Sequence, residues 1–354
     1  MKFKQFNVGR LTFIDQLRGI ACLMVVMCHL NGLFTYYGAL GVEIFFVLSG
    51  FIIPYSVRKI DITNVKLLYV FLVRRFVRLA PPYYASIFIT FLIYSAQNIF
   101  LKNHHIVLPS PLDILASIFF LQFILNFEPI NPVYWTICIE SQFYVFFGLL
   151  LLFCKKIFIL CKIKNIEFYI YQFTFFVSLL LYYKNYVANI SSEHSAIFVS
   201  YWIMFGIGIM SFWSFSNKIS YRYVVTVFLL LLVLSVFWKN IELVTATLTG
   251  FFIVLCTYRE KLADWLNFPL TQFFGKISYS LYLIHFPVIV VMTNFFHKID
   301  GKKTIFEALF DFVVMFITFT TLSAILYYTV EIPATKLAST LSSSVMDSKT
   351  LQKK

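Results

Sequence analysis

Charged residues are scarce in this sequence. Only 13% of its 354 residues are Asp, Glu, Lys or Arg, whereas 60% are hydrophobic and 20% are aromatic. A water-soluble domain needs far more polar surface than this composition provides. The scarcity therefore excludes a soluble globular protein, and we expect an integral membrane protein whose surface contacts the lipid bilayer.

Acidic residues are rarer than basic ones. The sequence has 16 Asp and Glu against 29 Lys and Arg, which gives a net charge of +13. Such an excess often indicates a nucleic-acid ligand. In a membrane protein it instead reflects Lys and Arg in the short loops that stay on the cytoplasmic side. We therefore expect no nucleic-acid partner.

The six cysteines show no CxxC or CxxH spacing, the pattern typical of zinc sites and redox motifs. Most of them lie within apolar segments, and we interpret them as thiols buried in the membrane. The sequence therefore predicts neither a disulfide framework nor a bound metal.

Long apolar segments are abundant, and a helix crosses a bilayer with roughly 16 to 22 apolar residues. Such segments predict ten spans, near residues 11–30, 42–57, 83–100, 134–154, 168–183, 196–215, 223–238, 242–257, 278–296 and 306–330. The sequence turns polar after residue 338. We expect one multi-span domain over 1–338 and a disordered cytoplasmic tail over 339–354.

The segment 111–125 is an ambiguous eleventh candidate, and the distribution of positive charge decides its assignment. With ten spans and the N-terminus inside, 22 of the 29 Lys and Arg fall on the cytoplasmic side and 6 on the other, and Arg18 lies within the first span. With an eleventh span the tally becomes 14 against 14. Because Lys and Arg favour the cytoplasmic side, we predict ten transmembrane helices, both termini cytoplasmic, and a re-entrant or outer-face segment at 111–125.

Three polar residues interrupt the first span, whose sequence is IDQLRGIACLMVVMCHL. On an α-helix, Arg18 and His29 are offset by about 20°, and Asp15 lies about 40° from His29. The three residues therefore share one face. Because charged groups in a bilayer are costly, we expect this face to point into the protein.

Two carboxylates are predicted at the depth of His29. Glu43 begins the second span from the outside, and Glu140 lies in the outer half of the fourth. A lone histidine in a membrane protein is more often structural, but one imidazole near two carboxylates suits proton transfer. We therefore interpret His29, Glu43 and Glu140 as a candidate catalytic group.

The cytoplasmic ends of the spans carry a different set of residues. In VRRFVRLAPPYY, Arg75 and Arg78 share a helix face, and we expect the helix to stop at Pro81. Paired guanidinium groups suit phosphate oxygens, although contact with lipid head groups is an alternative. In GKISYSLYLIHFP, we expect Tyr279 and His285 in the inner half of the ninth span.

Six motifs occur in one order along the chain: DQLRGIACLMVVMCH, GVEIFFVLSGFII, RRFVRLAPPYY, VYWTICIE, GKISYSLYLIH and EIPATKL. This order resembles that of the acyltransferase 3 family, from about residue 12 to 337. The resemblance implies a bacterial cytoplasmic-membrane enzyme that moves an acyl group, commonly acetyl. The implied donor is cytoplasmic acyl-CoA, and the implied acceptor is a hydroxyl on a glycan or lipid-linked sugar.

The resemblance also implies roles for individual residues. His29 matches the essential histidine of the first helix, with Glu43 or Glu140 as the residue that orients it. Arg75 and Arg78 match the arginine pair that the family associates with the donor. We expect Arg18, Tyr279 and His285 to contact acyl-CoA as well. No metal is implied.

Two questions about mechanism stay open at the level of sequence. His29 could act as a general base, or it could carry the acyl group as an acyl-imidazole. The alternative function is a proton-coupled secondary transporter or glycan exporter that uses His29, Glu43 and Glu140 as a proton relay. Such transporters typically show paired repeats with broken helices, and the sequence shows no convincing pair.

Overall fold

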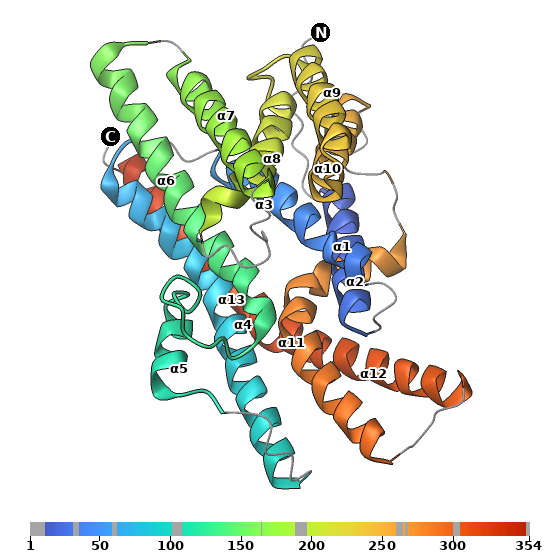
Figure 1. Ribbon diagram of the computed structural model, residues 1–354. Coiled ribbons are helices and arrows are strands. Elements are labelled where there is room, and N and C mark those ends of the chain that lie inside the picture. The colour runs from blue at the N-terminus through green and yellow to red at the C-terminus, as the bar shows by residue number, and fades with distance from the viewer. Residues whose placement is uncertain are drawn as a thin grey trace. The chain divides into compact units, whose positions relative to one another are not determined.

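The structure is a computed structural model (Figure 1). It describes residues 11–30, 35–58, 62–100, 108–163, 165–187, 197–259, 265, 268–299 and 305–351. The regular structure within these ranges is helical, without a strand. The all-α prediction is confirmed.

Helices α1 to α6 are bounded as follows: α1 (Thr12–Leu30), α2 (Thr35–Ala39), α3 (Gly41–Val57), α4 (Val65–Phe100), α5 (Pro111–Ile118) and α6 (Trp135–Cys161). The later α-helices are α7 (Ile166–Val187), α8 (Trp202–Phe215), α9 (Tyr221–Phe237), α10 (Ile241–Tyr258), α11 (Pro269–Ile299), α12 (Ile305–Leu326) and α13 (Ile332–Leu351). The short 3-10 helices η2 (Pro132–Tyr134) and η4 (Phe198–Tyr201) precede α6 and α8.

Nine helical segments in the described ranges are long and apolar enough to cross a bilayer. Helix α9 is also apolar but somewhat shorter, and it coincides with the predicted span 223–238. Each of the ten predicted spans therefore corresponds to an apolar helix. The chain is a multi-pass, all-helical membrane protein.

The chain forms two compact units, each assembled from segments that are distant in sequence. Unit 1 comprises Met1–Cys28, Phe34–Leu68 and Gln142–Lys276. Unit 2 comprises His29–Leu33, Tyr69–Ser141 and Ile277–Lys354.

In unit 1, helices α3 and α8 pack backbone against backbone. A Cβ atom on Gly50 would overlap the carbonyl oxygen of Phe205, and one on Gly208 would overlap that of Val47. Only glycine permits this approach, as in the small-residue contacts of other membrane helices. The segment LSGF of α3 thus serves packing.

The start of α11 packs against α1 in the same way. A Cβ atom on Gly19 would overlap the carbonyl oxygen of Thr271, and one on Gly275 would overlap that of Asp15. The buried side chain of Gln16 accepts a hydrogen bond from the Thr271 hydroxyl. These reciprocal contacts fix α1, which carries the polar face predicted from sequence.

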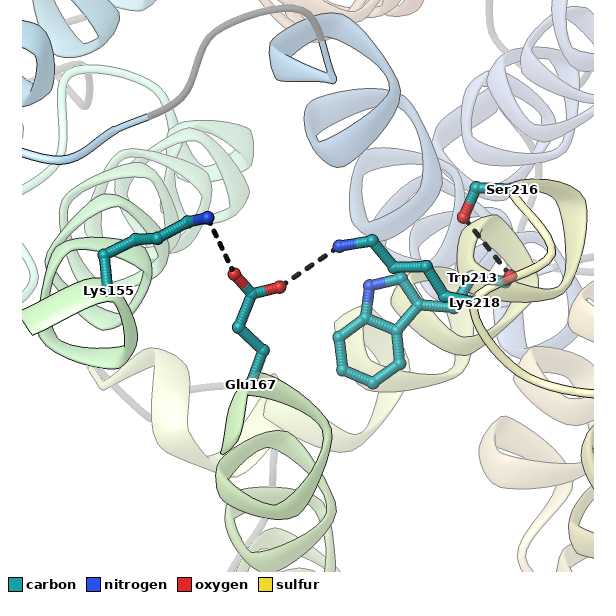
Figure 2. A network of polar contacts seen from close by, with 5 residues as sticks. All are labelled: Lys155, Glu167, Trp213, Ser216 and Lys218. Atoms are coloured by element: carbon teal, nitrogen blue, oxygen red, sulfur yellow. Dashed lines mark hydrogen bonds and ion pairs between the residues drawn. The ribbon is translucent and has the colours of Figure 1, made fainter. Parts of the chain in front are cut away.

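Segments of unit 1 that charge counting assigns to the same side of the membrane contact one another. Glu167 at the start of α7 bridges Lys155 of α6 and Lys218 of the α8–α9 turn, at 3.7 and 3.1 Å (Figure 2). At the other ends of the helices, the Tyr182 hydroxyl donates to Asn240 Oδ1 at 3.0 Å. Helices α7 to α10 therefore alternate in direction as predicted.

The ambiguous segment near 111–125 forms the short helix α5 followed by non-helical chain. Its eight residues span only about 12 Å, against a bilayer core of about 30 Å. Ser110 and Asp113 form a capping box, and Asp113 Oδ1 accepts from the Glu128 amide at 3.2 Å. These hydrogen bonds, led by that of Ser110, hold the pKa of Asp113 below its usual value. The segment is not a span, as predicted.

Two expectations about helix ends were wrong. Helix α4 runs through Pro81 and Pro82 without stopping. The two prolines leave the carbonyl oxygens of Val77 and Arg78 without helical donors. The Tyr279 hydroxyl donates to the next carbonyl oxygen, that of Leu79, at 2.8 Å. Helix α13 continues to Leu351, into the tail for which we expected no regular structure. The sequence after Pro333 contains no glycine or proline to end it.

Candidate active site

The centre of the site is a break in the hydrogen bonding of α11. Pro287 lies inside this helix and has no N–H, so it leaves the carbonyl oxygen of Leu283 without its helical donor. The buried side chain of Asn131 supplies one instead, with Nδ2 3.3 Å from the Leu283 oxygen. Asn131 Oδ1 accepts from the Val133 amide at 3.2 Å, so both ends of the side-chain amide are bonded.

His285 precedes this proline by two residues and is fully buried. Its Nδ1 lies 2.8 Å from the carbonyl oxygen of Tyr282 and 3.2 Å from that of Leu281. Carbonyl oxygens only accept hydrogen bonds, so Nδ1 carries the proton and Nε2 keeps a lone pair. Nε2 is buried, and no hydrogen-bond partner for it is present in the described part of the chain.

His29 lies against this histidine. The two ring centroids are 5.1 Å apart and the ring planes meet at 64°, an edge-on contact. The ring of Phe286 contacts His29 as well, at 5.3 Å and 90°. The half-buried imidazole at the end of α1 is therefore held by two neighbouring residues of α11.

The sequence predicted these two histidines at different depths, and this expectation was wrong. We placed His285 in the inner half of a span that begins at residue 278. Helix α11 begins earlier, at Pro269, so His285 lies about 24 Å along it. The polar segment before residue 278 belongs to the helix and moves His285 to the level of His29.

The N-terminal end of α6 braces the same part of α11. The Tyr282 hydroxyl donates to the Val133 carbonyl oxygen and accepts from Thr136 Oγ1, both at 2.8 Å. Next to it, Ser86 Oγ and Tyr134 Oη are 2.8 Å apart and buried. The motifs NPVYW and YLIHFP, about 150 residues apart in sequence, thus form one hydrogen-bonded unit.

The arginine motif lies on α4, also in unit 2. Arg75 is buried, and its guanidinium carbon is 5.8 Å from the centroid of the Phe71 ring. Arg78 is half-buried one turn later. The Arg74 Nε donates to the Ala338 carbonyl oxygen at 3.3 Å, a structural contact to α13.

Tyr279 and Ser280 connect α11 to this region. The Tyr279 hydroxyl donates to Leu79, the residue directly after Arg78. Ser280 Oγ donates to Glu331 Oε2 at 2.6 Å. Glu331 is buried at the end of the π-helix η5 (Tyr327–Glu331), an irregular turn between α12 and α13.

Three further predicted site residues are found on α1, α3 and α6. Arg18, half-buried on α1, and Glu43, buried in the first turn of α3, belong to unit 1. Glu140 lies in unit 2 on α6, one turn beyond Thr136, and is half-buried. The structure therefore brings His29 together with His285, and Tyr279 together with the arginine turn of α4.

Two residues of the site were missed from sequence. Asn131 and Tyr282 hold the break in α11, and each lies within or beside a quoted motif. The available signal was Pro287, because a proline inside a helix calls for a donor to a freed carbonyl group. No group of three or more His, Cys, Asp or Glu that could hold a metal is present in the described ranges.

Comparison with known proteins places the sequence in a family. The sequence matches the family described as Acyltransferase domain over residues 11–328. Similar proteins include "Putative O-acetyltransferase SACOL0978" of Staphylococcus aureus (strain COL), 28% identical over 91% of this chain and 57% of that protein. "O-acetyltransferase OatA" of Staphylococcus aureus (strain NCTC 8325 / PS 47) is 25% identical over 88% of this chain and 55% of that protein.

The chain thus spans somewhat more than half the length of the curated relatives it matches. No solved structure matches it. The family match covers most of the chain, including His29, the arginine turn of α4 and the break in α11. The chain belongs to the membrane acyltransferase family that this domain defines.

Proposed function

We propose that this protein is an O-acyltransferase of a bacterial cytoplasmic membrane. It moves an acetyl group from cytoplasmic acetyl-CoA to a hydroxyl of a glycan or lipid-linked sugar. The names of the similar proteins support O-acetyl transfer, and the resemblance of the motifs supports acyl-CoA as the donor. The observation that carries the proposal is the contact between His29 and a buried histidine of the broken helix α11.

His29 is the general base in this proposal. One nitrogen of its ring takes the proton from the acceptor hydroxyl as that oxygen attacks the thioester carbonyl carbon. The C–O bond forms, the C–S bond breaks, and the thiolate of CoA leaves with the proton returned by the imidazolium. Only one ring nitrogen needs to face the acceptor.

The donor end is formed by Arg75, Arg78 and Tyr279. Guanidinium groups bind phosphate oxygens in paired geometry, and CoA carries its negative charge at its nucleotide end. The Tyr279 hydroxyl is bonded to the backbone beside Arg78, so it holds the turn that presents the arginines. Arg18, on the polar face of α1, contacts the arm of the donor in this proposal.

The test is transfer of labelled acetyl from acetyl-CoA by the purified protein in proteoliposomes, with an envelope glycan as acceptor. His29→Ala is expected to lower the rate at least about 100-fold, the usual size of a general-base contribution. Cys28→Ala, at the adjacent half-buried position, is the matched control and should transfer normally. A normal rate in His29→Ala would contradict the assignment of the base.

Mass spectrometry of envelope glycans from cells with and without the gene identifies the acceptor and the acyl group together. The alternative, a proton-coupled transporter or exporter, predicts transport into sealed vesicles without acyl-CoA. Two results together would favour the transporter: net movement of glycan into vesicles without acyl-CoA, and no acetyl transfer when acetyl-CoA is added.

A further inference from the structure

Nε2 of His285 is a buried hydrogen-bond acceptor that nothing in the described part of the chain satisfies. Leaving such a group unpaired costs about 1–3 kcal/mol, so it calls for an explanation. The carbonyl oxygens of Tyr282 and Leu281 hold the protonated Nδ1 and thereby direct the lone pair of Nε2 away from the helix backbone.

The neighbouring polar ring is that of His29. Its centroid is 5.1 Å from that of His285, in an edge-on arrangement, and Phe286 packs against it at 5.3 Å. A centroid separation of 5.1 Å is compatible with a hydrogen bond between ring nitrogens at facing edges. Hydrogen bonds of this kind are often long or misaligned in an enzyme without substrate.

We propose that His285 is a positioning residue for His29. Its Nε2 accepts the N–H of His29, so the other nitrogen of His29 presents its lone pair to the acceptor hydroxyl. When His29 takes the proton, the imidazolium that forms keeps its hydrogen bond to the neutral ring of His285. This inference rests on the proposed function and gives His285 the part that a carboxylate has in a Ser-His-Asp triad.

The structure explains how the tautomer of His285 is maintained. Two backbone carbonyl oxygens accept from Nδ1, and Pro287 leaves the following turn of α11 short of a donor. Asn131 closes that turn at Leu283. The break in α11 therefore produces a fixed acceptor at the position where the base of the reaction lies.

The first test is independent of activity. A chain in which four histidines are replaced by Gln retains only His29 and His285; the replaced residues are His104, His105, His194 and His297. Selective ¹⁵N labelling of histidine in detergent then reports which nitrogen carries the proton. The expected spectrum of His285 shows a protonated Nδ1 and an unprotonated Nε2. Adding His29→Ala to this chain leaves His285 as its single histidine, which assigns the signals. A protonated Nε2 would overturn the proposal.

The second test separates positioning from packing. His285→Gln keeps an acceptor near the position of Nε2, whereas His285→Leu removes it at similar volume. We expect His285→Leu to lower kcat about 10- to 100-fold with the KM for acetyl-CoA within about twofold, and His285→Gln to recover most of that loss. Equal losses in the two variants at equal membrane abundance, or normal kcat in His285→Leu, would overturn the proposal.

The two tests also distinguish this inference from the proposed function. If the wild-type protein transfers no acetyl group, the proposed function fails while the tautomer of His285 can still be measured. If transfer depends on His29 but is unaffected by His285→Leu, the proposed function stands and the positioning role is wrong.

Discussion

The Nδ2 atom of Asn131 donates to the carbonyl oxygen of Leu283, the group that Pro287 leaves without a helical donor. One side chain thus joins the start of α6 to the middle of α11. Because His285 lies between Leu283 and Pro287, this hydrogen bond also stabilises the turn that holds the buried histidine. The relationship makes Asn131 the clearest target for testing the architecture of the site.

Replacing Asn131 should destabilise the protein and be rescued at a second position. Asn131→Ala leaves the Leu283 oxygen buried and unpaired, at a cost of about 1–3 kcal/mol. Adding Pro287→Ala restores a backbone N–H at the right position in the helix, so the double variant should recover part of that loss. Thermal unfolding in detergent of the four chains of this cycle measures the coupling.

Strictly additive losses in the Asn131 and Pro287 variants would contradict the pairing. Thr136→Val is a suitable control, because it removes a hydrogen bond to Tyr282 at the same end of α6 without changing the Leu283 oxygen. Its effect should be independent of Pro287→Ala.

The arginines of α4 should separate into two kinds. Arg75→Ala and Arg78→Ala are expected to raise the KM for acetyl-CoA roughly tenfold, about the worth of one charge-assisted hydrogen bond. Arg74→Ala should leave that KM unchanged and lower the thermal midpoint slightly, because Arg74 bonds the backbone of Ala338. Initial rates at varied acetyl-CoA decide this. An equal change of the KM for acetyl-CoA in all three variants would contradict donor binding and favour contact of the arginines with lipid head groups.

The contact between α3 and α8 should tolerate no side chain. Gly50→Ala places a methyl group on a backbone oxygen that cannot move aside, and we expect a loss of about 1–3 kcal/mol or more. Gly206→Ala is the matched control, because its Cβ would meet the ring of Phe175, a side chain that can shift. Thermal midpoints that fall equally in the two variants would contradict this distinction.

The loop after α5 should open at low pH. Its carboxylate Asp113 has a folded pKa below the ordinary value of about 3.9. Its contribution is therefore complete above about pH 4 and is lost as the pH falls through the folded pKa. Hydrogen exchange of residues 110–128 should be faster in Asp113→Asn than in wild type at pH 7. The difference should shrink as the pH falls through the folded pKa, after correction for intrinsic exchange, and a difference that persists once Asp113 is fully protonated would contradict the assignment.

Most of the fold was predictable because a bilayer imposes length and apolarity on each span. Charge counting placed the segment 111–125 outside the set of spans, and the short helix α5 agrees with that result. The ends of helices were less predictable. Proline was expected to end α4, but the helix continues through Pro81 and Pro82. A side chain from α11 bonds the backbone of the same turn at Leu79, and no sequence rule predicts such a distant partner.

The site was predictable in its residue types more than in its pairing. The position of His29 on a polar face indicated chemistry, and the motifs indicated the arginines. The contact of His29 with His285 was not predictable, because it depends on where α11 begins. Because the residues before 278 are polar, the sequence did not predict that they form the first turns of α11. His285 was therefore predicted at a different depth from His29, although their rings are in contact.

The π-helix Tyr327–Glu331 has a consequence for how this chain tolerates insertions and deletions. A π-turn contains about one residue more than an α-turn and is accommodated as a local bulge. Deleting a single residue there would remove the bulge and leave regular helix, with the residues that follow facing nearly as before. The carboxylate that accepts from Ser280 would then keep its direction. The same deletion inside a regular α-helix would rotate every following side chain by about 100°, so this turn is the place where the helix can lose a residue without losing its orientation.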